Sequence, residues 1–480
     1  AAGGGTATES QLAQATTPGG EDQGGVQSTP GYQPQGGIQS TPGYQPQTEE
    51  TQPGTERMPR PMSPLLRLPP RREAGGEYLI EEPTEDVSYV EPERGETVAS
   101  RVRPELEPFG VRVGSFLFFP WVTGEEEFNS NIFATPDDEK SDLIHHVEPG
   151  FILDSNWNRH RLTLRADADL GFYTDNDSED FKDYRAGVAG RLDVMRGAYL
   201  TGSADYKHLH EERSSPDDVG GSEPTEFDDI ALRAAYVQQF GRFRARLLGS
   251  FDALDFQDVP AGGGGTIDND DRDRYEAEGT LRVGYEIVPD YETYVQGSYN
   301  MRDYQRALDD NGFNRDSHGF AADAGVEVDF GGILFGDFFV GYRQQEYSDP
   351  AFDTIDGLDA GATLTWNVTP LTTVVGTVKR SIGETIQSGS AGYTGTELDL
   401  SIDHELLRNL ILGLDVTYIN RDYDGIDRSD DVYQAGIDAN YMMNRNIYVT
   451  ASYQYTDRRS TVGDAEYSQH IALVGLKLQY

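Results

Sequence analysis

The sequence predicts an all-β fold, a transmembrane antiparallel up-and-down β-barrel of about eighteen strands preceded by a disordered N-terminal tail. Two observations support this prediction. From about residue 109 to the end, segments of about ten to fifteen residues alternate apolar with polar side chains, as strands with two different faces do. Short and long connections between these segments also alternate strictly, as they do in outer-membrane barrels.

The alternation is clearest at residues 161–173. One face of this segment is Leu162, Leu164, Ala166, Ala168, Leu170 and Phe172, and the other includes Thr163, Arg165, Asp167, Asp169 and Tyr173. The segments 277–287 and 320–329 repeat the arrangement. A soluble β-sandwich also alternates, but it would not usually keep one charged face along strands of this length. A wet lumen on one side and lipid on the other explains both faces.

The connections support the same topology. Eight tight ones are predicted near residues 156–159, 196–198, 241, 289–291, 331–332, 369–371, 408–409 and 444–446. Nine longer, mostly acidic ones are predicted near residues 136–141, 175–183, 213–226, 259–273, 307–317, 348–356, 385–395, 422–431 and 459–466. An even number of strands would put both ends of the barrel at the short-turn side, which is the periplasmic side in such barrels.

Composition excludes several classes of protein. The chain has no cysteine, which excludes a disulfide scaffold, a cysteine nucleophile, cysteine-ligated zinc and a lipid-modified cysteine anchor. With 83 acidic and 39 basic residues its net charge is −44, which argues against nucleic-acid binding. No apolar run approaches the roughly twenty residues that a transmembrane helix needs. The 27 tyrosines suit half-buried strand surfaces and the membrane–water boundary.

Residues 1–105 show almost no core pattern and are predicted to be a disordered periplasmic tail, while residues 106–480 form the barrel. Residues 24–35 (GGVQSTPGYQPQ) recur almost unchanged as residues 36–47 (GGIQSTPGYQPQ). A flexible spacer is the favoured interpretation. The alternative is a docking segment for peptidoglycan or a periplasmic partner, with Tyr32 and Tyr44 as anchors. The first residues, AAGGGTATES, fit either the product of signal-peptide cleavage or a trimmed start.

The charged face of the strands supplies the candidate lumen-lining residues. They are Arg165, Asp167, Arg185, Arg191, Asp193, Asp205, Arg233, Arg244, Arg246, Asp252, Arg282, Arg302, Arg343, Asp399, Asp415 and Arg421. A wall of this kind can hydrogen-bond hydroxyl-rich solutes, and its arginines can pair with the carboxylates of uronic acids. The alternative is that these charges pair across neighbouring strands and stiffen the barrel. The sequence does not apportion the two roles.

The last strand ends as outer-membrane strands commonly do. Ala472, Val474, Leu476, Leu478 and Tyr480 share one face and finish in a terminal aromatic residue. This ending resembles the C-terminal strand by which barrel-assembly machinery recognises its clients. Leu476, Leu478 and Tyr480 are therefore the candidate assembly signal.

A search for catalytic chemistry gives no convincing site, so we expect no enzyme. His208 and His210 could face the same way near Glu211, but a polar lumen holds histidines without special reason. The segment Gly389-Ser390-Ala391-Gly392 lacks the leading glycine and the strand–turn–helix context of a nucleophile elbow. We expect no cofactor and no dedicated metal site.

Two acidic clusters, at Asp268–Asp273 and Asp175–Glu179, lack the glycine and distal glutamate of a calcium loop. Solvated loops, bridged at most by divalent cations to lipopolysaccharide phosphates, are the favoured interpretation of these clusters.

Residues 109–134 resemble the opening strand of the outer-membrane β-barrel porin family that is associated with exopolysaccharide export loci. The matching positions are Gly114, Ser115, Phe116 and Pro120, followed by Phe128, Asn131, Ile132 and Phe133. Asn129 and Ser130 replace two aspartates of the family pattern, which weakens any ion-binding role there. The resemblance extends over residues 109–480 as a strand pattern. It implies a conduit in the bacterial outer membrane that works with periplasmic export proteins to release exopolysaccharide.

Three functions from different classes follow, in order of preference. The first is a wide polar pore that passes a hydrophilic substrate without covalent chemistry, and the expected substrate is an exopolysaccharide. The second is a closed structural barrel that anchors partners through its tail or its acidic loops. The third is an enzyme acting on envelope lipid, which would depend on His208, His210 or Ser390. The expected surroundings are outer-membrane lipid and lipopolysaccharide in a Gram-negative envelope.

Overall fold

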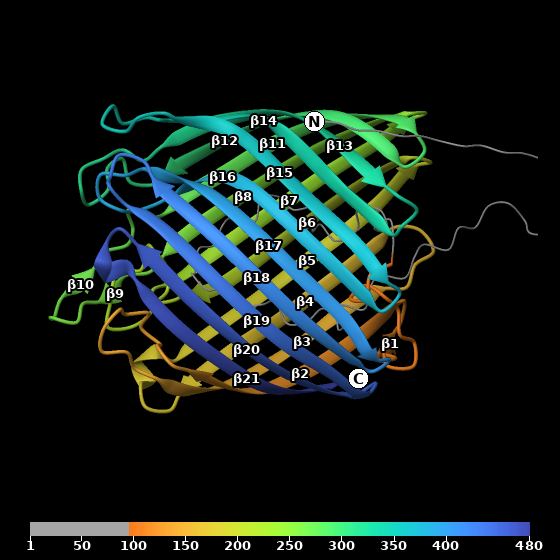
Figure 1. Ribbon diagram of the computed structural model, residues 1–480, viewed down its shortest axis with the longest axis horizontal. Coiled ribbons are helices and arrows are strands. Elements are labelled where there is room, and N and C mark those ends of the chain that lie inside the picture. Colours follow the sequence, from red (N-terminus) through yellow and green to blue (C-terminus); the bar gives the residue numbers. More distant parts are fainter. Residues whose placement is uncertain (1–95) are drawn as a thin grey trace, which may run out of the picture. The chain divides into compact units, whose positions relative to one another are not determined.

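The computed structural model describes residues 96–480, which form one closed antiparallel barrel (Figure 1). The main sheet contains 19 strands, of which β1 (Val111–Val113) is a three-residue strand paired with the start of β2 (Phe116–Asn129). The other eighteen strands make the wall, and β2 closes it by pairing with β21 (Tyr467–Gln479). The predicted fold class is confirmed, including the number of strands. Residues 1–95 of the predicted tail, with both repeats, lie outside the described residues.

The wall strands are 13 to 16 residues long. Between β2 and β21 they are β3 (Asp142–Ser155), β4 (Arg161–Tyr173), β5 (Phe181–Met195), β6 (Ala198–His210), β7 (Glu226–Phe240), β8 (Phe243–Phe256), β11 (Arg274–Val288), β12 (Tyr291–Tyr304), β13 (Ser317–Asp329), β14 (Leu334–Tyr347), β15 (Ile355–Thr369), β16 (Thr372–Glu384), β17 (Gly392–Leu407), β18 (Leu410–Tyr423), β19 (Ser429–Asn444) and β20 (Ile447–Ser460). A tilted strand crosses a bilayer in about 9–11 residues, so these strands extend beyond it.

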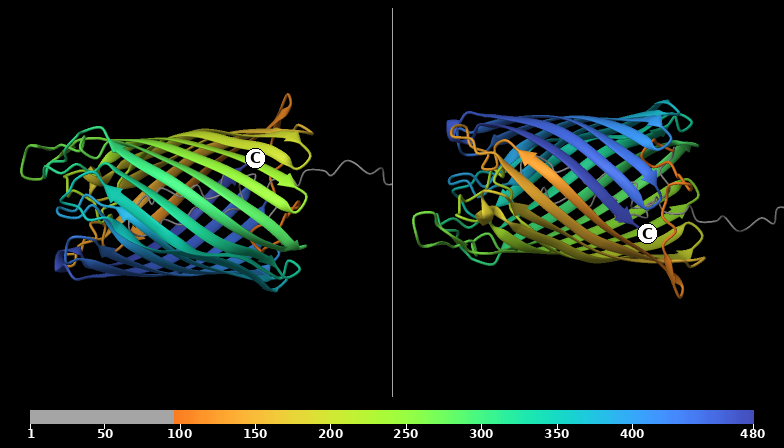
Figure 2. Two further views of the ribbon diagram at one scale, coloured as in Figure 1. Left: turned by 90° about the horizontal axis from the view of Figure 1, so that it is seen from above. Right: turned by 90° about the horizontal axis from the view of Figure 1, so that it is seen from below.

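Short turns and long loops gather at opposite ends of the barrel (Figure 2). Eight turns join the strands at one end, all of them where the sequence predicted tight connections. Gly197 and Gly241 occupy two of these turns with φ of +75° and +62°, a region that glycine enters without steric cost. The nine long loops lie at the other end, and one of them carries the hairpin of β9 (Val259–Pro260) and β10 (Thr266–Ile267).

The two faces of the wall differ as the alternation predicted. On β11 and β12 the exposed residues include Leu281, Val283, Val295 and Met301, and Val295 is 61% exposed. The residues between them, such as Arg302, pair in register with polar residues of the neighbouring strand. Contacts between strands that are not neighbours identify the polar face as the inner one, since such contacts must cross the barrel interior. An apolar outer face is what lipid requires.

Buried apolar clusters are small and lie near the ends of the wall. One consists of Val98, Leu106, Ile411, Met442 and Tyr448, and the other of Phe227, Leu254 and Phe256 with Leu209 against it. The two short 3₁₀ turns, Asp177–Glu179 and Gly463–Ala465, lie in long loops. Among residues 96–480, no helix reaches the length and apolarity needed to cross a membrane.

Several inward-facing aromatic rings lie across a glycine of a neighbouring strand. A Cβ atom at Gly325 would lie 2.3 Å from the Tyr294 ring, and one at Gly361 would lie 2.3 Å from the Phe339 ring. Glycine therefore leaves room for a large ring to lie flat against the wall, and the ring covers the exposed backbone in return. This device fixes the orientation of inner aromatic side chains.

The two faces can be tested with neighbouring residues. We expect Val295→Arg on the outer face to lower the free energy of unfolding by about 2–4 kcal/mol, because it places a charge in the lipid belt. Ser298→Arg, three residues along on the inner face and opposite the uncharged residues Thr280 and Ala321, should change it by less than about 1 kcal/mol. Urea titration of the barrel refolded in lipid measures both. Equal effects of the two substitutions would contradict the assignment of the faces.

Candidate functional site

The strand register places all sixteen residues predicted to line the lumen on the inner face. Asp167 lies opposite Arg185, Arg246 opposite Arg282, and Asp399 opposite Thr417. Because paired residues share a face and the face alternates along a strand, these pairs and their neighbours place the whole set on the inner side. Whether they line a permeation path remains a prediction.

Many of these charges are already paired. Asp167 accepts the Nε–H of Arg165 and of Arg185, each at 2.6 Å. Arg191 pairs with Asp193 at 2.9 Å, Arg233 with Asp252 at 2.8 Å, and Arg343 with Asp359 at 3.1 Å. The predicted cross-strand pairing is therefore present in the barrel. An arginine–carboxylate pair has no net charge, but its two groups still include several hydrogen-bond donors and acceptors.

Other pairs connect strands that are not neighbours. Arg282 of β11 reaches Asp337 of β14 at 2.7 Å and stacks on the Tyr294 ring, with the guanidinium 3.3 Å from the ring centroid. Arg302 of β12 reaches Glu384 of β16 at 2.6 Å, and it also pairs with Glu276 of the neighbouring strand β11 at 3.2 Å. The sequence analysis identified the arginines but missed Asp337, Glu276 and Glu384. Only their position on the polar face of an alternating segment could have indicated them.

The long loop at residues 211–225 folds inward and contacts the long loop that follows β16. This loop joins β6 to β7, and β6 lies nearly opposite β16, with seven wall strands between them on one side and nine on the other. Asp217 accepts hydrogen bonds from the Thr385 hydroxyl at 2.7 Å and from the Ile386 N–H at 3.2 Å. The Gln387 amide donates to the Pro216 carbonyl at 2.8 Å. The loop therefore bridges the barrel near its long-loop end.

Buried polar contacts hold the base of this loop. Arg272 forms two hydrogen bonds to Glu211, at 2.8 and 3.0 Å, and both side chains are buried. Burial lowers the pKa of Arg272, but the Glu211 carboxylate outweighs burial and holds that pKa above its ordinary value. Arg458 of β20 donates to the Ser214 carbonyl at 2.8 Å. A buried bidentate pair fixes geometry strongly.

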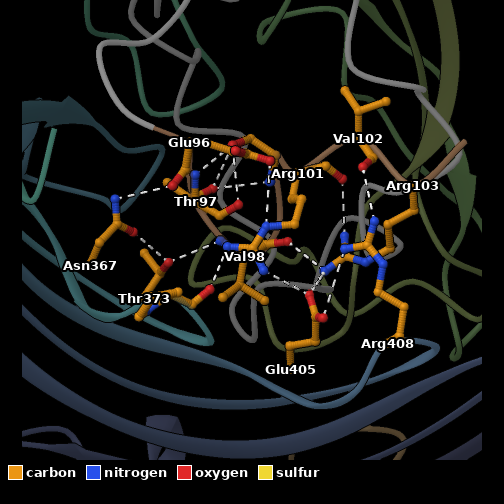
Figure 3. A network of polar contacts seen from close by, with 12 residues as sticks. Glu96, Thr97, Val98, Arg101, Val102, Arg103, Asn367, Thr373, Glu405 and Arg408 are labelled. Carbon is orange, nitrogen blue, oxygen red and sulfur yellow. Dashed lines mark hydrogen bonds and ion pairs between the residues drawn. The ribbon is translucent and has the colours of Figure 1, made fainter. Parts of the chain in front are cut away.

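At the short-turn end, residues 96–107 pack against the inner wall, and we call this segment the strap (Figure 3). The Glu405 carboxylate accepts hydrogen bonds from Arg103 at 2.7 Å and from Arg101 at 3.0 Å. Arg103 is completely buried and also donates to the Val98 carbonyl. Residues 96–105 fall in the range assigned to the tail from sequence, yet they form turns and make these contacts.

Apolar and backbone contacts complete the docking of the strap. The Val98 N–H donates to the Thr373 hydroxyl at 2.9 Å, and the Tyr448 hydroxyl donates to the Leu106 carbonyl at 2.9 Å. Val98 and Leu106 belong to the apolar cluster with Met442 and Tyr448. The strap therefore follows the inner ends of β16 to β20, and its backbone polar groups are bound by the wall.

The histidines and the serine considered for catalysis have separate partners. His208 binds Asp228 at 2.8 Å, while His210 binds Asp183 at 2.9 Å and stacks on Phe181. Ser390 is buried and donates to the Gly392 carbonyl at 2.9 Å. The described residues thus do not bring these groups together into one constellation.

The acidic loops contain one close group of carboxylates. Oxygen atoms of Asp258, Asp268 and Asp270 lie within 4.8 Å of one another. Arg306 pairs with Asp268 at 2.9 Å and with Asp270 at 2.6 Å, which offsets part of their charge. In the second cluster Glu179 pairs with Arg213 at 2.7 Å. Divalent-cation binding at these loops stays a prediction.

The C-terminal residues of the candidate assembly signal lie on the outer face. Leu476, Leu478 and Tyr480 are 47%, 45% and 62% exposed. Their strand, β21, pairs with β2 at the closing seam of the barrel. Their role in assembly stays a prediction.

The closed wall, apolar outside and charged inside, defines a transmembrane β-barrel of the porin class. The chain belongs to the family described as "Putative beta-barrel porin 2", whose model matches residues 103–480. The predicted membership of a β-barrel porin family is thereby confirmed, and the match begins within the strap. A search of curated proteins finds no match to the sequence.

Solved structures of similar chains come from Pseudomonas aeruginosa. OccK3 (OpdO) has a TM-score of 0.41 at 14% identity, covering 77% of this chain and 96% of that chain. The outer membrane protein OpdK has a TM-score of 0.41 at 10% identity, covering 76% and 99%. The siderophore receptor PirA has a TM-score of 0.42 at 6% identity, covering 78% and 81%. These values are too low to support a conclusion about function.

The buried carboxylate of Glu405 pairs with Arg101 and Arg103 of the strap, whereas Glu105 of the strap makes an exposed pair with Arg408, and the two contacts can be compared directly. We expect Glu405→Gln to speed hydrogen exchange of the strap amides about 10²–10⁴-fold, because it leaves Arg103 charged and buried at a cost of about 3–5 kcal/mol. Glu105→Gln breaks the exposed pair with Arg408 and should change exchange less than about fivefold. Mass spectrometry of the peptide covering residues 96–107 measures both. Similar rates in the two variants would show that the ion pair with Glu405 does not hold the strap.

Proposed function

We propose that this protein is an outer-membrane porin that passes a hydrophilic substrate and takes part in exopolysaccharide export. The observation that carries the proposal is the inner face of the barrel, which is polar and charged along eighteen strands. Barrels of about sixteen to eighteen strands are wide enough for an aqueous channel. Ion pairs within this wall stiffen the barrel, but the exposed arginines Arg165 and Arg185 also leave polar surface that a hydrophilic solute could contact.

The paired charges favour a hydroxyl-rich substrate. In the Arg165–Asp167–Arg185 group, each arginine binds Asp167 through Nε, and the two arginine side chains remain 41% and 39% exposed. Paired guanidinium and carboxylate groups together offer donors and acceptors, which is what sugar hydroxyls need. The proposed substrate is therefore a polysaccharide, delivered by periplasmic export proteins. No covalent chemistry is required of this chain, and we propose no cofactor.

The proposed orientation follows the rule for such barrels. The short-turn end, where the strap docks, would face the periplasm, and the long loops would face outward next to lipopolysaccharide. The C-terminal residues Leu476, Leu478 and Tyr480 would serve the barrel-assembly machinery. In this orientation the chain preceding Glu96 would lie in the periplasm, available to export partners.

Single-channel recording in planar bilayers tests the pore. We expect the refolded full-length protein, or a variant lacking residues 1–95, to give stable openings, because a polar lumen conducts ions. Openings only after truncation would show that the N-terminal residues close the pore. Heat-modifiable migration on gels serves as the control for folding. Silence of both folded proteins would refute the pore and favour an anchoring barrel that acts through its tail or its loops.

The export role needs a separate test in cells. Deletion of the chain should reduce cell-surface polysaccharide several-fold and cause it to accumulate in the periplasm, because an export conduit is lost. Complementation with the full-length chain should restore the surface level, and complementation with an unrelated porin should not. Fractionation and sugar analysis of the envelope measure both quantities. Normal surface polysaccharide in the deletion strain would refute the export role while leaving the pore intact.

A further inference from the structure

One part of the inner wall presents its arginines to solvent, whereas the rest buries them. The side chains of Arg165 and Arg185 are 41% and 39% exposed. The arginines on β8, β11, β12 and β14 are far less accessible. Their exposed fractions are 9% for Arg244, 9% for Arg246, 12% for Arg282, 16% for Arg302 and 16% for Arg343. The more accessible arginines, Arg165 and Arg185, therefore lie on β4 and β5.

An aromatic ring lies next to these two arginines. Trp121 pairs in register with Gly150, Gly150 with Asp167, and Asp167 with Arg185, so these four residues form one row across β2 to β5. A Cβ atom at Gly150 would lie 2.3 Å from Cζ2 of Trp121, which shows that the indole lies over this glycine. The indole is half-buried and points along the row toward Asp167.

Cations lie near the indole as well. The Arg165 guanidinium is 6.0 Å and the Lys477 ammonium 5.0 Å from its ring centroid. The charges that act on Lys477 are those of Glu148, Glu125, Asp167 and Arg165. With Arg185, and with Lys207, which lies opposite Arg185 in register and pairs with Asp229 at 3.1 Å, the region holds cations and carboxylates in nearly equal numbers. A balanced region has no net attraction for an ion of either sign.

We propose that Trp121, Asp167 and Arg185 form a binding subsite for an uncharged sugar ring of the transported polysaccharide. This inference deepens the proposed function and rests on it. The indole offers an apolar surface for the C–H face of the ring, and the arginine and carboxylate bind neighbouring hydroxyls. Asp167 is a positioning group too, since it holds both guanidinium groups by their Nε atoms.

The charge of the molecule argues against an acidic sugar at this place. The whole chain carries a net charge of −44, and the balanced subsite does not offset it. A polyanion would be repelled on approach, whereas an uncharged polysaccharide would not. The subsite therefore selects by shape and hydrogen bonding rather than by net charge.

Equilibrium binding to the full-length protein in detergent tests the subsite without requiring conduction. The uncharged probes are maltohexaose and cellohexaose, and hexagalacturonate is the acidic probe of the same length. The chain contains 3 tryptophans, so the double variant W157F/W366F leaves Trp121 as the only indole reporter. Titration calorimetry gives the affinity, and tryptophan emission reports contact at Trp121.

We expect at least one uncharged oligomer to bind and shift the emission of Trp121. Trp121→Ala and Arg185→Ala should each weaken binding about tenfold or more, because each removes one of the recognition surfaces. Arg459→Ala removes an equally charged side chain that is 69% exposed elsewhere, and it should leave affinity unchanged. Gly150→Ala keeps every side chain of the subsite but displaces the indole, so it should weaken binding as Trp121→Ala does.

Several results would overturn the inference. These are binding of neither uncharged oligomer, equal affinity in wild type and in folded Arg185→Ala, or tighter binding of hexagalacturonate than of both uncharged probes. The result of the sugar-binding experiment can be distinguished from the result of the conductance experiment. Conduction without sugar binding would refute the subsite alone, and sugar binding by a barrel that stays silent in bilayers would refute the pore alone.

Discussion

Closure of the hydrogen-bonded wall is the constraint on which the rest of this structure depends. Lipid offers no partner to a free backbone N–H or carbonyl group, so a sheet that spans the membrane must have no open edge. The pairing of β2 with β21 removes the last edge. Closure in turn divides the side chains into an apolar outer set and an inner set shielded from lipid. The charged residues on which the proposed pore depends belong to the inner set, whereas the candidate assembly signal belongs to the outer set.

An inner set that is rich in charge creates a second requirement. Buried arginines such as Arg103, Arg272 and Arg282 are stable only with nearby carboxylates, because an unpaired buried charge is costly. The chain meets this requirement with partners from distant segments as well as from neighbouring strands. The inward loop at residues 211–225 and the strap are both held in this way. The same ion pairs therefore balance the charge and position the segments that narrow the lumen at its two ends.

Features that repeat every two residues along the chain could be predicted from the sequence, whereas contacts between distant segments could not. Alternation every two residues was enough to predict the strands, the positions of the eight tight turns and the face on which residues such as Arg165 and Asp399 lie. The strap could not be predicted, since Arg103 and Glu405 are 302 residues apart and no periodicity links them. The pair of Arg282 and Asp337 escaped for a related reason, because it skips two strands. The predicted boundary between tail and barrel at residue 105 was based on composition. Composition cannot identify a polar segment, such as residues 96–105, that is ordered only by its contacts with the wall.

The distribution of accessible charge within the lumen connects these points to function. On β8, β11, β12 and β14 arginines are consumed in ion pairs that brace the wall, and their guanidinium groups have little surface left for a solute. On β4 and β5 a single carboxylate, Asp167, serves two arginines and leaves both accessible. Because two arginines share one carboxylate there, their guanidinium groups stay accessible, and Gly150 leaves room for the Trp121 indole beside them. These two features distinguish a surface that can bind a solute from one that only supports the barrel. Under the proposed function, a chain of sugars would contact the accessible arginines of β4 and β5 rather than the arginines held in ion pairs on β8, β11, β12 and β14.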